Sequence, residues 1–330
     1  MPNTKNKKIA YKIIRELYKD KNSLSVTLTG SYSEHFNLNK AGDIDIIVIC
    51  KNLNKIYFQK CINKIKNLKK KIFNNNQELL INSTFGPIKF YKKNSIVFHL
   101  MIYDLKSHIE HTIKSPFTCY DWERSNIYIG KSLRELSPVF NLQLRDFREA
   151  RRSTQEYLND ILKNKISYRE YRFKNRKVNL RKKYFLINKI NRRDFIYHTI
   201  KFLLINYIKF EKCKNVKISD KEIDKKFLEI TKNKRDLIIF KKLRFLKNNK
   251  SQKNIKSPRI FAINFIKYFN KLIRNKIKSN RPVFFIRHKK TIINTGIFLG
   301  QKLNPTIQDK KITQEFNNIK IKKCISSPSK

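Results

Sequence analysis

Apolar and polar residues alternate with two different periods in the first 130 residues, and this mixture predicts an α/β fold. A period of two, or a short unbroken apolar run, is typical of a strand, whereas apolar positions three and four apart are typical of a helix. Helices are predicted at residues 9–18 and 53–73. Strands are predicted at residues 24–29, 43–49, 78–82, 88–91, 95–104 and 127–130, with a hairpin turn at 92–94.

After residue 130 the pattern becomes helical, with Lys and Arg on the faces opposite the apolar positions. A polar stretch at 248–258 interrupts this period and predicts a linker, which a further helix follows. The last segment opens on an apolar strand at 283–286. These changes divide the chain into an α/β domain (1–130), an all-helical domain (131–247), a linker with a helix (248–280) and a final segment (281–330).

The net charge of the chain indicates a class of binding partner. The chain has 76 Lys and Arg against 25 Asp and Glu, a formal net charge of +51. Such a charge attracts polyanions, with RNA, DNA and nucleotide phosphates as candidates. A composition rich in Lys, Ile and Asn is also what an AT-rich coding sequence produces, so charge alone identifies no partner. Residues 168–183 interleave aromatic and basic side chains, which is typical of nucleic-acid binding and also of a solvated lysine-rich surface.

The cysteines and the apolar runs predict the compartment. Five cysteines are scattered without a CxxC pair, which argues against a structural zinc site and a disulfide framework. The first residues have no long apolar region behind their charges, unlike a signal peptide. No apolar run approaches the ~18–20 residues that a membrane span needs. We therefore expect a cytoplasmic protein with no membrane partner; the sequence does not predict an oligomeric state.

A Gly-Ser pair and two carboxylates fall at a chemically meaningful spacing. Gly30 and Ser31 follow the strand at 24–29, where a turn into a helix frees N–H groups that suit a phosphate. Asp43 and Asp45 lie two positions apart at the start of an apolar strand, so they face the same side. Paired carboxylates repel each other unless a cation neutralises them, and oxygen ligands favour Mg²⁺. A turn followed by a solvated strand residue is the alternative interpretation of the two aspartates.

These residues resemble the signature of the nucleotidyltransferase superfamily related to DNA polymerase β, in which Gly-Gly or Gly-Ser precedes an Asp-x-Asp strand. The resemblance implies a small mixed-sheet α/β core with a helical partner domain that closes over the nucleotide. It implies that Asp43 and Asp45 are catalytic and hold Mg²⁺, with two ions as one option, and that Gly30 and Ser31 bind the triphosphate. The implied reaction moves a nucleoside monophosphate from an NTP to a hydroxyl or phosphate acceptor.

Members of that superfamily usually take a third carboxylate from a neighbouring strand, and the position that resembles it here holds His99. Asp104 lies at the end of the same predicted strand with opposite parity, so both side chains cannot face one metal site. The third ligand is therefore expected to be His99 or Asp104. The other interpretations of His99 are a hydrogen bond to a phosphate and a buried core histidine. The alternative function is a catalytically inactive protein that binds nucleotide or nucleic acid, in which His99 marks the loss of the third metal ligand.

A second motif lies after the linker. Arg287 and His288 end an apolar strand and are followed by Thr291, Asn294 and Gly300, which resembles the opening of the histidine phosphatase (phosphoglycerate mutase-like) superfamily. The resemblance implies that His288 becomes phosphorylated while Arg287 and Asn294 hold the phosphate. Too few residues follow for the second histidine and the general acid of that fold, so we expect an incomplete α/β segment without phosphatase activity.

The phosphatase-like segment and the basic composition point to different acceptors for the transferred nucleotide. The phosphatase-like segment favours a small molecule, because that superfamily acts on small phosphorylated metabolites. The net charge and the basic aromatic run at 168–183 favour RNA. We expect the small-molecule acceptor and keep RNA as the alternative.

Overall fold

The computed structural model describes most residues from 4 to 279, and the statements below refer to these. The gaps are at residues 38–42, 73–77, 87–94, 140, 141, 143, 175, 176, 213, 250, 252, 254, 256, 257 and 280–330. The chain divides into two compact units, 1–273 and 274–330, and the fold described here is that of the first. The strand predicted at 88–91, the turn at 92–94 and the segment 281–330 lie outside the described residues.

A five-stranded mixed sheet occupies the first part of the chain, and the predicted α/β class is confirmed. Its strand order is β3-β4-β2-β1-β5. β2 is parallel to β4 and β4 to β3, whereas β1 is antiparallel to both β2 and β5. The strands are β1 (Ser23–Thr29), β2 (Ile44–Cys50), β3 (Glu78–Asn82), β4 (Ser95–Asp104) and β5 (Tyr128–Gly130).

Helices accompany this sheet in the predicted alternation. Both helices predicted here are confirmed, at 9–18 and 53–73, and a short helix follows β1 directly. They are α1 (Thr4–Tyr18), α2 (Gly30–His35), α3 (Lys55–Ile72), α4 (Leu105–Lys114), α5 (Pro116–Trp122) and α6 (Leu133–Leu136).

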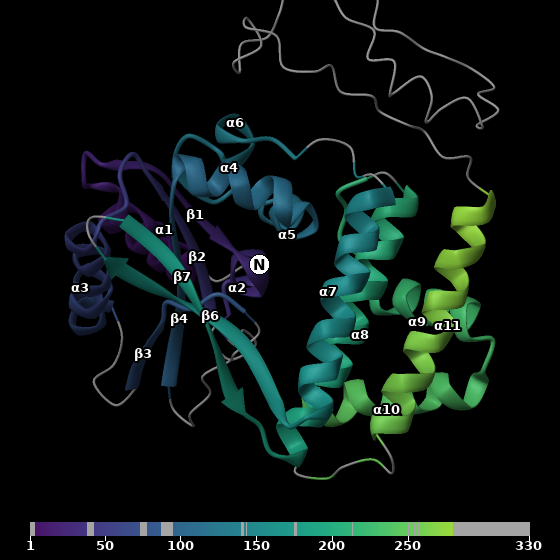
Figure 1. Ribbon diagram of the computed structural model, residues 1–330. Coiled ribbons are helices and arrows are strands. Elements are labelled where there is room, and N and C mark those ends of the chain that lie inside the picture. Colours follow the sequence, from purple (N-terminus) through teal and green to yellow (C-terminus); the bar gives the residue numbers. More distant parts are fainter. Residues whose placement is uncertain are drawn as a thin grey trace, which may run out of the picture. The chain divides into compact units, whose positions relative to one another are not determined.

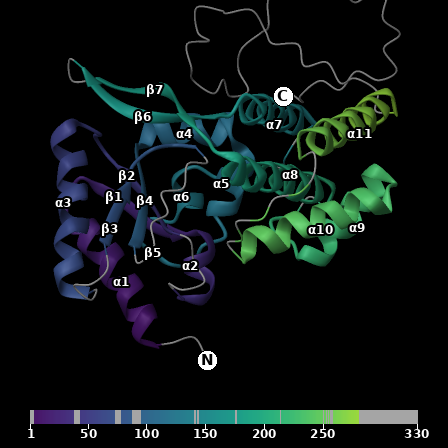
Figure 2. The same ribbon diagram turned by 90° about the horizontal axis from the view of Figure 1, so that it is seen from below.

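Both faces of the sheet are buried, which explains the unbroken apolar run of β2. Ile46 and Val48 belong to the hydrophobic cluster that α1 and α3 share with the sheet. Ile47 and Ile49 point the other way, into a second cluster that includes side chains from α5 and α6. Figure 1 and Figure 2 show α1 and α3 on one side of the sheet and α4 and α5 on the other. A strand covered on both sides has no polar face, so alternation is lost.

The rest of the described chain is helical, as predicted, except for a β-hairpin that the sequence analysis missed. The basic aromatic run at 168–183 lies within this hairpin. The elements are α7 (Leu144–Leu162), β6 (Lys165–Lys174), β7 (Lys177–Leu186), α8 (Lys189–Lys212), α9 (Asp220–Thr231), α10 (Lys234–Asn248) and α11 (Pro258–Ser279). Among these and the earlier helices, none is both long and apolar enough to cross a bilayer.

Tyr171 of β6 attaches the hairpin to the sheet. Its ring contacts Phe58 and Phe85 at centroid distances of 4.8 and 5.0 Å. Its hydroxyl accepts a hydrogen bond of 2.7 Å from the backbone N–H of Ile102 and donates one to the Ile102 carbonyl. In the described residues the pairing of β3 with β4 ends at His99. Beyond that point the Tyr171 hydroxyl takes the place of a strand as the hydrogen-bond partner of the β4 backbone at Ile102.

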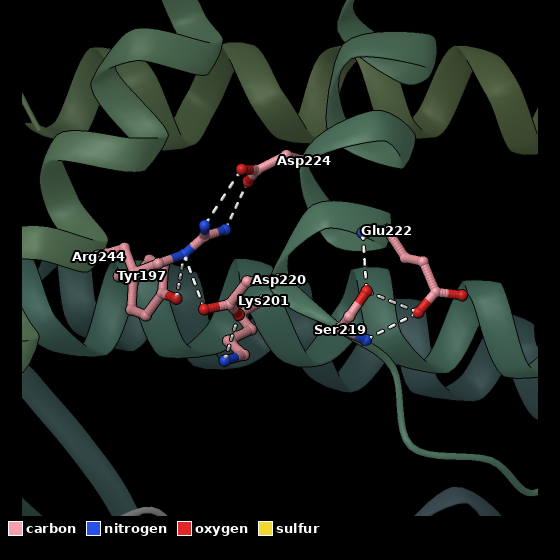
Figure 3. Close-up of polar contacts among 7 residues, drawn as sticks. All are labelled: Tyr197, Lys201, Ser219, Asp220, Glu222, Asp224 and Arg244. Atoms are coloured by element: carbon pink, nitrogen blue, oxygen red, sulfur yellow. Dashed lines mark hydrogen bonds and ion pairs between the residues drawn. The ribbon is translucent and has the colours of Figure 1, made fainter.

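Arg244 of α10 ties three helices together (Figure 3). Its guanidinium forms two hydrogen bonds with Asp224 of α9, at 3.1 and 2.5 Å, and its Nε donates to the Tyr197 hydroxyl of α8 at 3.1 Å. The same figure shows the capping box that begins α9, in which Ser219 accepts from the N–H of Glu222 and the Glu222 carboxylate accepts from the N–H of Ser219. Paired and bidentate contacts of this kind fix the orientation of the helices.

Substitution Tyr171→Phe is expected to lower the free energy of unfolding by about 1–3 kcal/mol, because the N–H and C=O of Ile102 lose their partner in a buried setting. Urea unfolding measures the change. Tyr168→Phe, on the opposite face of the same strand, is the control and is expected to change little. Equal stabilities of the two variants would contradict the role of the Tyr171 hydroxyl.

Substitution Arg244→Ala is expected to cost about 1–3 kcal/mol of unfolding free energy, since Asp224 and Tyr197 are left without their donor. Lys241→Ala on the same helix removes a cation that lies 3.8 Å from Asp224 but is mostly exposed, so its cost stays below about 1 kcal/mol. Thermal or urea unfolding of both variants makes the comparison. A larger loss in Lys241→Ala would show that charge, and not the bidentate geometry, stabilises this region.

Candidate functional site

Strand register brings together the residues that the sequence analysis singled out. The antiparallel pairing of β1 and β2 places Asp45 opposite Thr29, the last residue of β1. The parallel pairing of β2 and β4 places the same Asp45 beside His99. Asp45 therefore lies between the turn that begins α2 and the central part of β4, although these segments are far apart in the sequence.

Asp43, Asp45 and His99 form a cluster that fits a divalent cation. Each offers one ligand atom, and these atoms all lie within 4.8 Å of one another. All three side chains are half-buried. Two carboxylate oxygens at this distance repel each other strongly in a partly dry site, and a cation between them removes that cost. Oxygen donors from carboxylates are the ligands that magnesium prefers.

His99 is held at both ring nitrogens. Its Nε2 lies 2.9 Å from the Thr84 carbonyl oxygen, and its Nδ1 lies 2.8 Å from Oδ1 of Asp45. A carbonyl and a carboxylate oxygen are both acceptors, so a ring protonated at both nitrogens would satisfy both contacts. Burial by itself lowers the pKa of His99, but the hydrogen bond and charge of Asp45, the Thr84 carbonyl and the charge of Asp43 outweigh it and raise that pKa.

This double contact also limits what His99 can do for a metal. Either ring nitrogen has to give up its present partner before it can act as a ligand. In the described geometry His99 fixes the orientation of the Asp45 carboxylate through a hydrogen bond. The roles expected for His99 were a metal ligand, a hydrogen bond to a phosphate and a core histidine. A hydrogen bond to the carboxylate of Asp45 was not among them.

Gly30 makes room for the Asp45 carboxylate. Its φ is +74°, and a Cβ at this position would lie 2.1 Å from Oδ2 of Asp45. No side chain fits at such a distance. Gly30 and Ser31 are exposed at the beginning of α2, immediately after β1. The predicted order of strand, Gly-Ser turn and helix is present, and the helix begins one residue earlier than expected.

Asp104 is not part of the cluster. It pairs with Cys50 in the register of β2 and β4, five positions beyond the pair of Asp45 and His99. Its Oδ1 accepts from the backbone N–H of Ser107 at 2.7 Å, so it caps the N-terminus of α4. Of the two expected third ligands, the fold therefore brings His99 to the aspartates.

A large cavity opens from this cluster. Its volume is about 1720 Å³, and Gly30, Ser31, Asp45 and His99 line one side of it. Ligand pockets usually measure about 300–1,000 Å³, so the cavity has room for more than one small ligand. Further lining residues are cations from α7, α8, the hairpin and two connecting segments: Arg124, Arg152, Arg169, Lys182, Lys209 and Lys217.

Four of these cations have acidic partners that also line the cavity. Arg124 lies 3.4 Å from Asp121, and Arg152 lies 2.8 Å from Glu149. Lys217 lies 2.6 Å from Glu34 of α2, and the buried Lys209 of α8 bonds to Asp121 of α5. Burial lowers the pKa of Lys209, and the charge of Asp121 opposes this effect. The sequence analysis identified none of these lining residues individually, because in a chain with 76 Lys and Arg no local signal distinguishes one cation from another.

Other predictions remain without a structural test. Arg287, His288 and Asn294 of the phosphatase-like motif lie outside the described residues.

Comparison of the chain with models of known protein families, with curated proteins and with solved structures gave no significant match.

Substitution Gly30→Ala is expected to disrupt the site, because the new methyl group would overlap the Asp45 carboxylate and Ala is strained at a positive φ. The expected loss of unfolding free energy is about 1–3 kcal/mol. Thermal unfolding measures this loss, and a shift of the melting temperature on adding Mg²⁺ reports the site itself. Ser31→Ala, exposed and next in the chain, is the control. An unchanged stability in Gly30→Ala would show that Asp45 can move away freely.

Proposed function

We propose that this chain is a magnesium-dependent nucleotidyltransferase that moves a nucleoside monophosphate from an NTP to a hydroxyl or phosphate acceptor, with a small phosphorylated molecule as the expected acceptor. The observation that carries the proposal is the cluster of Asp43, Asp45 and His99 at the cavity. Its position beside the Gly-Ser start of α2 agrees with the motif that the sequence resembles.

The residues of the chain have distinct roles in this proposal. Asp43 and Asp45 hold the cation, and His99 keeps the Asp45 carboxylate in one orientation through its 2.8 Å hydrogen bond. Gly30 and Ser31 offer the exposed start of α2 to the triphosphate, where backbone N–H groups favour an anion. An Mg²⁺ ion held by these carboxylates would supply positive charge to the attacking and leaving oxygens.

The test is pyrophosphate release from purified protein with Mg²⁺, each NTP, and a panel of sugar, sugar-phosphate and RNA acceptors. Asp43→Ala and Asp45→Ala are each expected to lower the rate at least about 100-fold, since even residues that only support a metal ligand are worth 10–100-fold. Asp104→Asn is the matched control, because asparagine caps a helix as well as aspartate does. An equal loss in Asp104→Asn would point to unfolding and not to the cluster.

A second candidate function is binding of a nucleotide without turnover. The observation in its favour is the occupation of the usual third-carboxylate position by His99, which engages one oxygen of Asp45. Calorimetry separates the two candidates. Magnesium-dependent NTP binding that is lost in Asp45→Ala, together with no pyrophosphate from any acceptor, would establish the binding protein and end the transferase proposal.

A further inference from the structure

Two cations face each other on the hairpin at the edge of the cavity. Arg169 of β6 and Lys182 of β7 are directly opposite in the antiparallel register, and both line the cavity that also contains Asp45. Like charges in directly opposed positions destabilise a strand pair. Neither side chain has an acidic partner among the residues that the structure describes, whereas the neighbouring Lys183 lies 2.6 Å from Glu170. The hairpin therefore presents an uncompensated positive pair to the cavity.

This pair is connected to the acidic cluster through the backbone. Arg169 and Phe85 exchange two backbone hydrogen bonds of 2.8 Å each. The residue before Phe85 is Thr84, whose carbonyl accepts from His99, and His99 in turn bonds to Asp45. Strand β6 is thus joined to the candidate site through Phe85, its chain neighbour Thr84 and His99. This path fixes the backbone of Arg169 relative to Asp45.

The close approach of the two segments depends on a glycine. Gly86 has a φ of +131°, and a Cβ there would meet the backbone of Ser167 and Tyr168 at 3.2 Å. This approach places the first half of β6 against the loop that follows β3. Figure 1 shows the hairpin extending from α3 toward α7, so that its two ends lie in different surroundings.

The face that carries the pair continues away from the cavity as a basic aromatic surface. Lys165 and Tyr184 share the face of Arg169 and Lys182 because strand positions alternate. The ammonium groups of Lys165 and Lys182 lie 4.2 and 5.4 Å from the centre of the Tyr184 ring, and half of Tyr184 is exposed. Aromatic rings among cations are the usual surface for unpaired bases and their phosphates.

The size of this surface distinguishes between possible anions. A single phosphorylated metabolite is neutralised by Arg169 and Lys182 and leaves Lys165 and Tyr184 unused. From Tyr171 onward this face packs against the sheet. The part from Lys165 to Arg169 spans about 17 Å of extended chain, which exceeds the length of one nucleotide. An extended polyanion with bases contacts all of this part.

We infer that this face of the hairpin, with Arg169 and Lys182 at its cavity end, binds a single-stranded nucleic acid whose terminus enters the cavity. The assignment of that terminus as the acceptor rests on the proposed transferase function; the binding of the strand does not. Nucleic acid thus replaces the small molecule as the expected acceptor, on the strength of the hairpin that the sequence did not predict.

The test compares two double variants with the same loss of formal charge. Arg169→Gln with Lys182→Gln removes the pair at the cavity, and Arg172→Gln with Arg181→Gln removes two exposed cations from the opposite face of the same strands. Fluorescence anisotropy of labelled 12-nucleotide single-stranded RNA and DNA is recorded over a salt series. Circular dichroism confirms that both variants are folded.

The first double variant is expected to bind at least about 10-fold more weakly at low salt, with the slope of log affinity against log salt reduced by about 1.4, as for two lost phosphate contacts. The second is expected to stay within about twofold of the unmodified protein. Equal losses in the two variants would show non-specific attraction by the whole charge and overturn the inference, and so would unchanged binding in the first.

The outcome is separable from that of the transferase proposal. If Asp45→Ala and the unmodified protein bind the oligonucleotide equally well and neither releases pyrophosphate, the hairpin surface stands and the enzyme does not. The opposite outcome has two parts. The unmodified protein releases pyrophosphate with a sugar phosphate, and the double variant of Arg169 and Lys182 keeps both that rate and its oligonucleotide binding. In that case the transferase proposal is supported and the hairpin surface is ruled out.

Discussion

The position of the Asp45 carboxylate is the constraint on which the site depends. One of its oxygens accepts from His99, and the other lies where any side chain on residue 30 would have to be. Three strands and the start of α2 therefore meet around a single side chain. This arrangement requires the antiparallel pairing of β1 with β2 and the parallel pairing of β2 with β4 at the same time. A shift of either register by one residue turns Asp45 away.

Acidic residues are informative in this chain because they are few. With 25 of them against 76 Lys and Arg, there are too few acids to pair one to one with most cations, and an unpaired cation by itself signifies little. Three of the acids join different elements: Glu34 pairs with Lys217, Asp121 with Lys209, and Asp224 with Arg244. Against that background, geometry distinguishes the pair of Arg169 and Lys182, because register places both on one face beside a cavity.

Local features were predictable from the sequence, and contacts between distant segments were not. The strands of the sheet, the start of α2 and the shared face of Asp43 and Asp45 follow from short-range patterns. Strand parity correctly set His99 apart from Asp104. The hairpin was missed because arginines and lysines occupy positions on both of its faces, which hides the period of two. The contact of Gly30 with Asp45 follows from register, for which no local signal exists.

The hydroxyl of Tyr171 has a consequence for association with other chains. Where the pairing of β3 with β4 ends, the backbone of Ile102 faces a side chain and not another strand. An open N–H and C=O at a sheet edge are a template on which a strand of a second molecule can add, and long apolar edges promote aggregation in this way. The hydroxyl of Tyr171 occupies both groups, and a side chain offers no backbone N–H or C=O to which a further strand could bind. The edge of β4 at Ile102 is therefore closed to the addition of a strand.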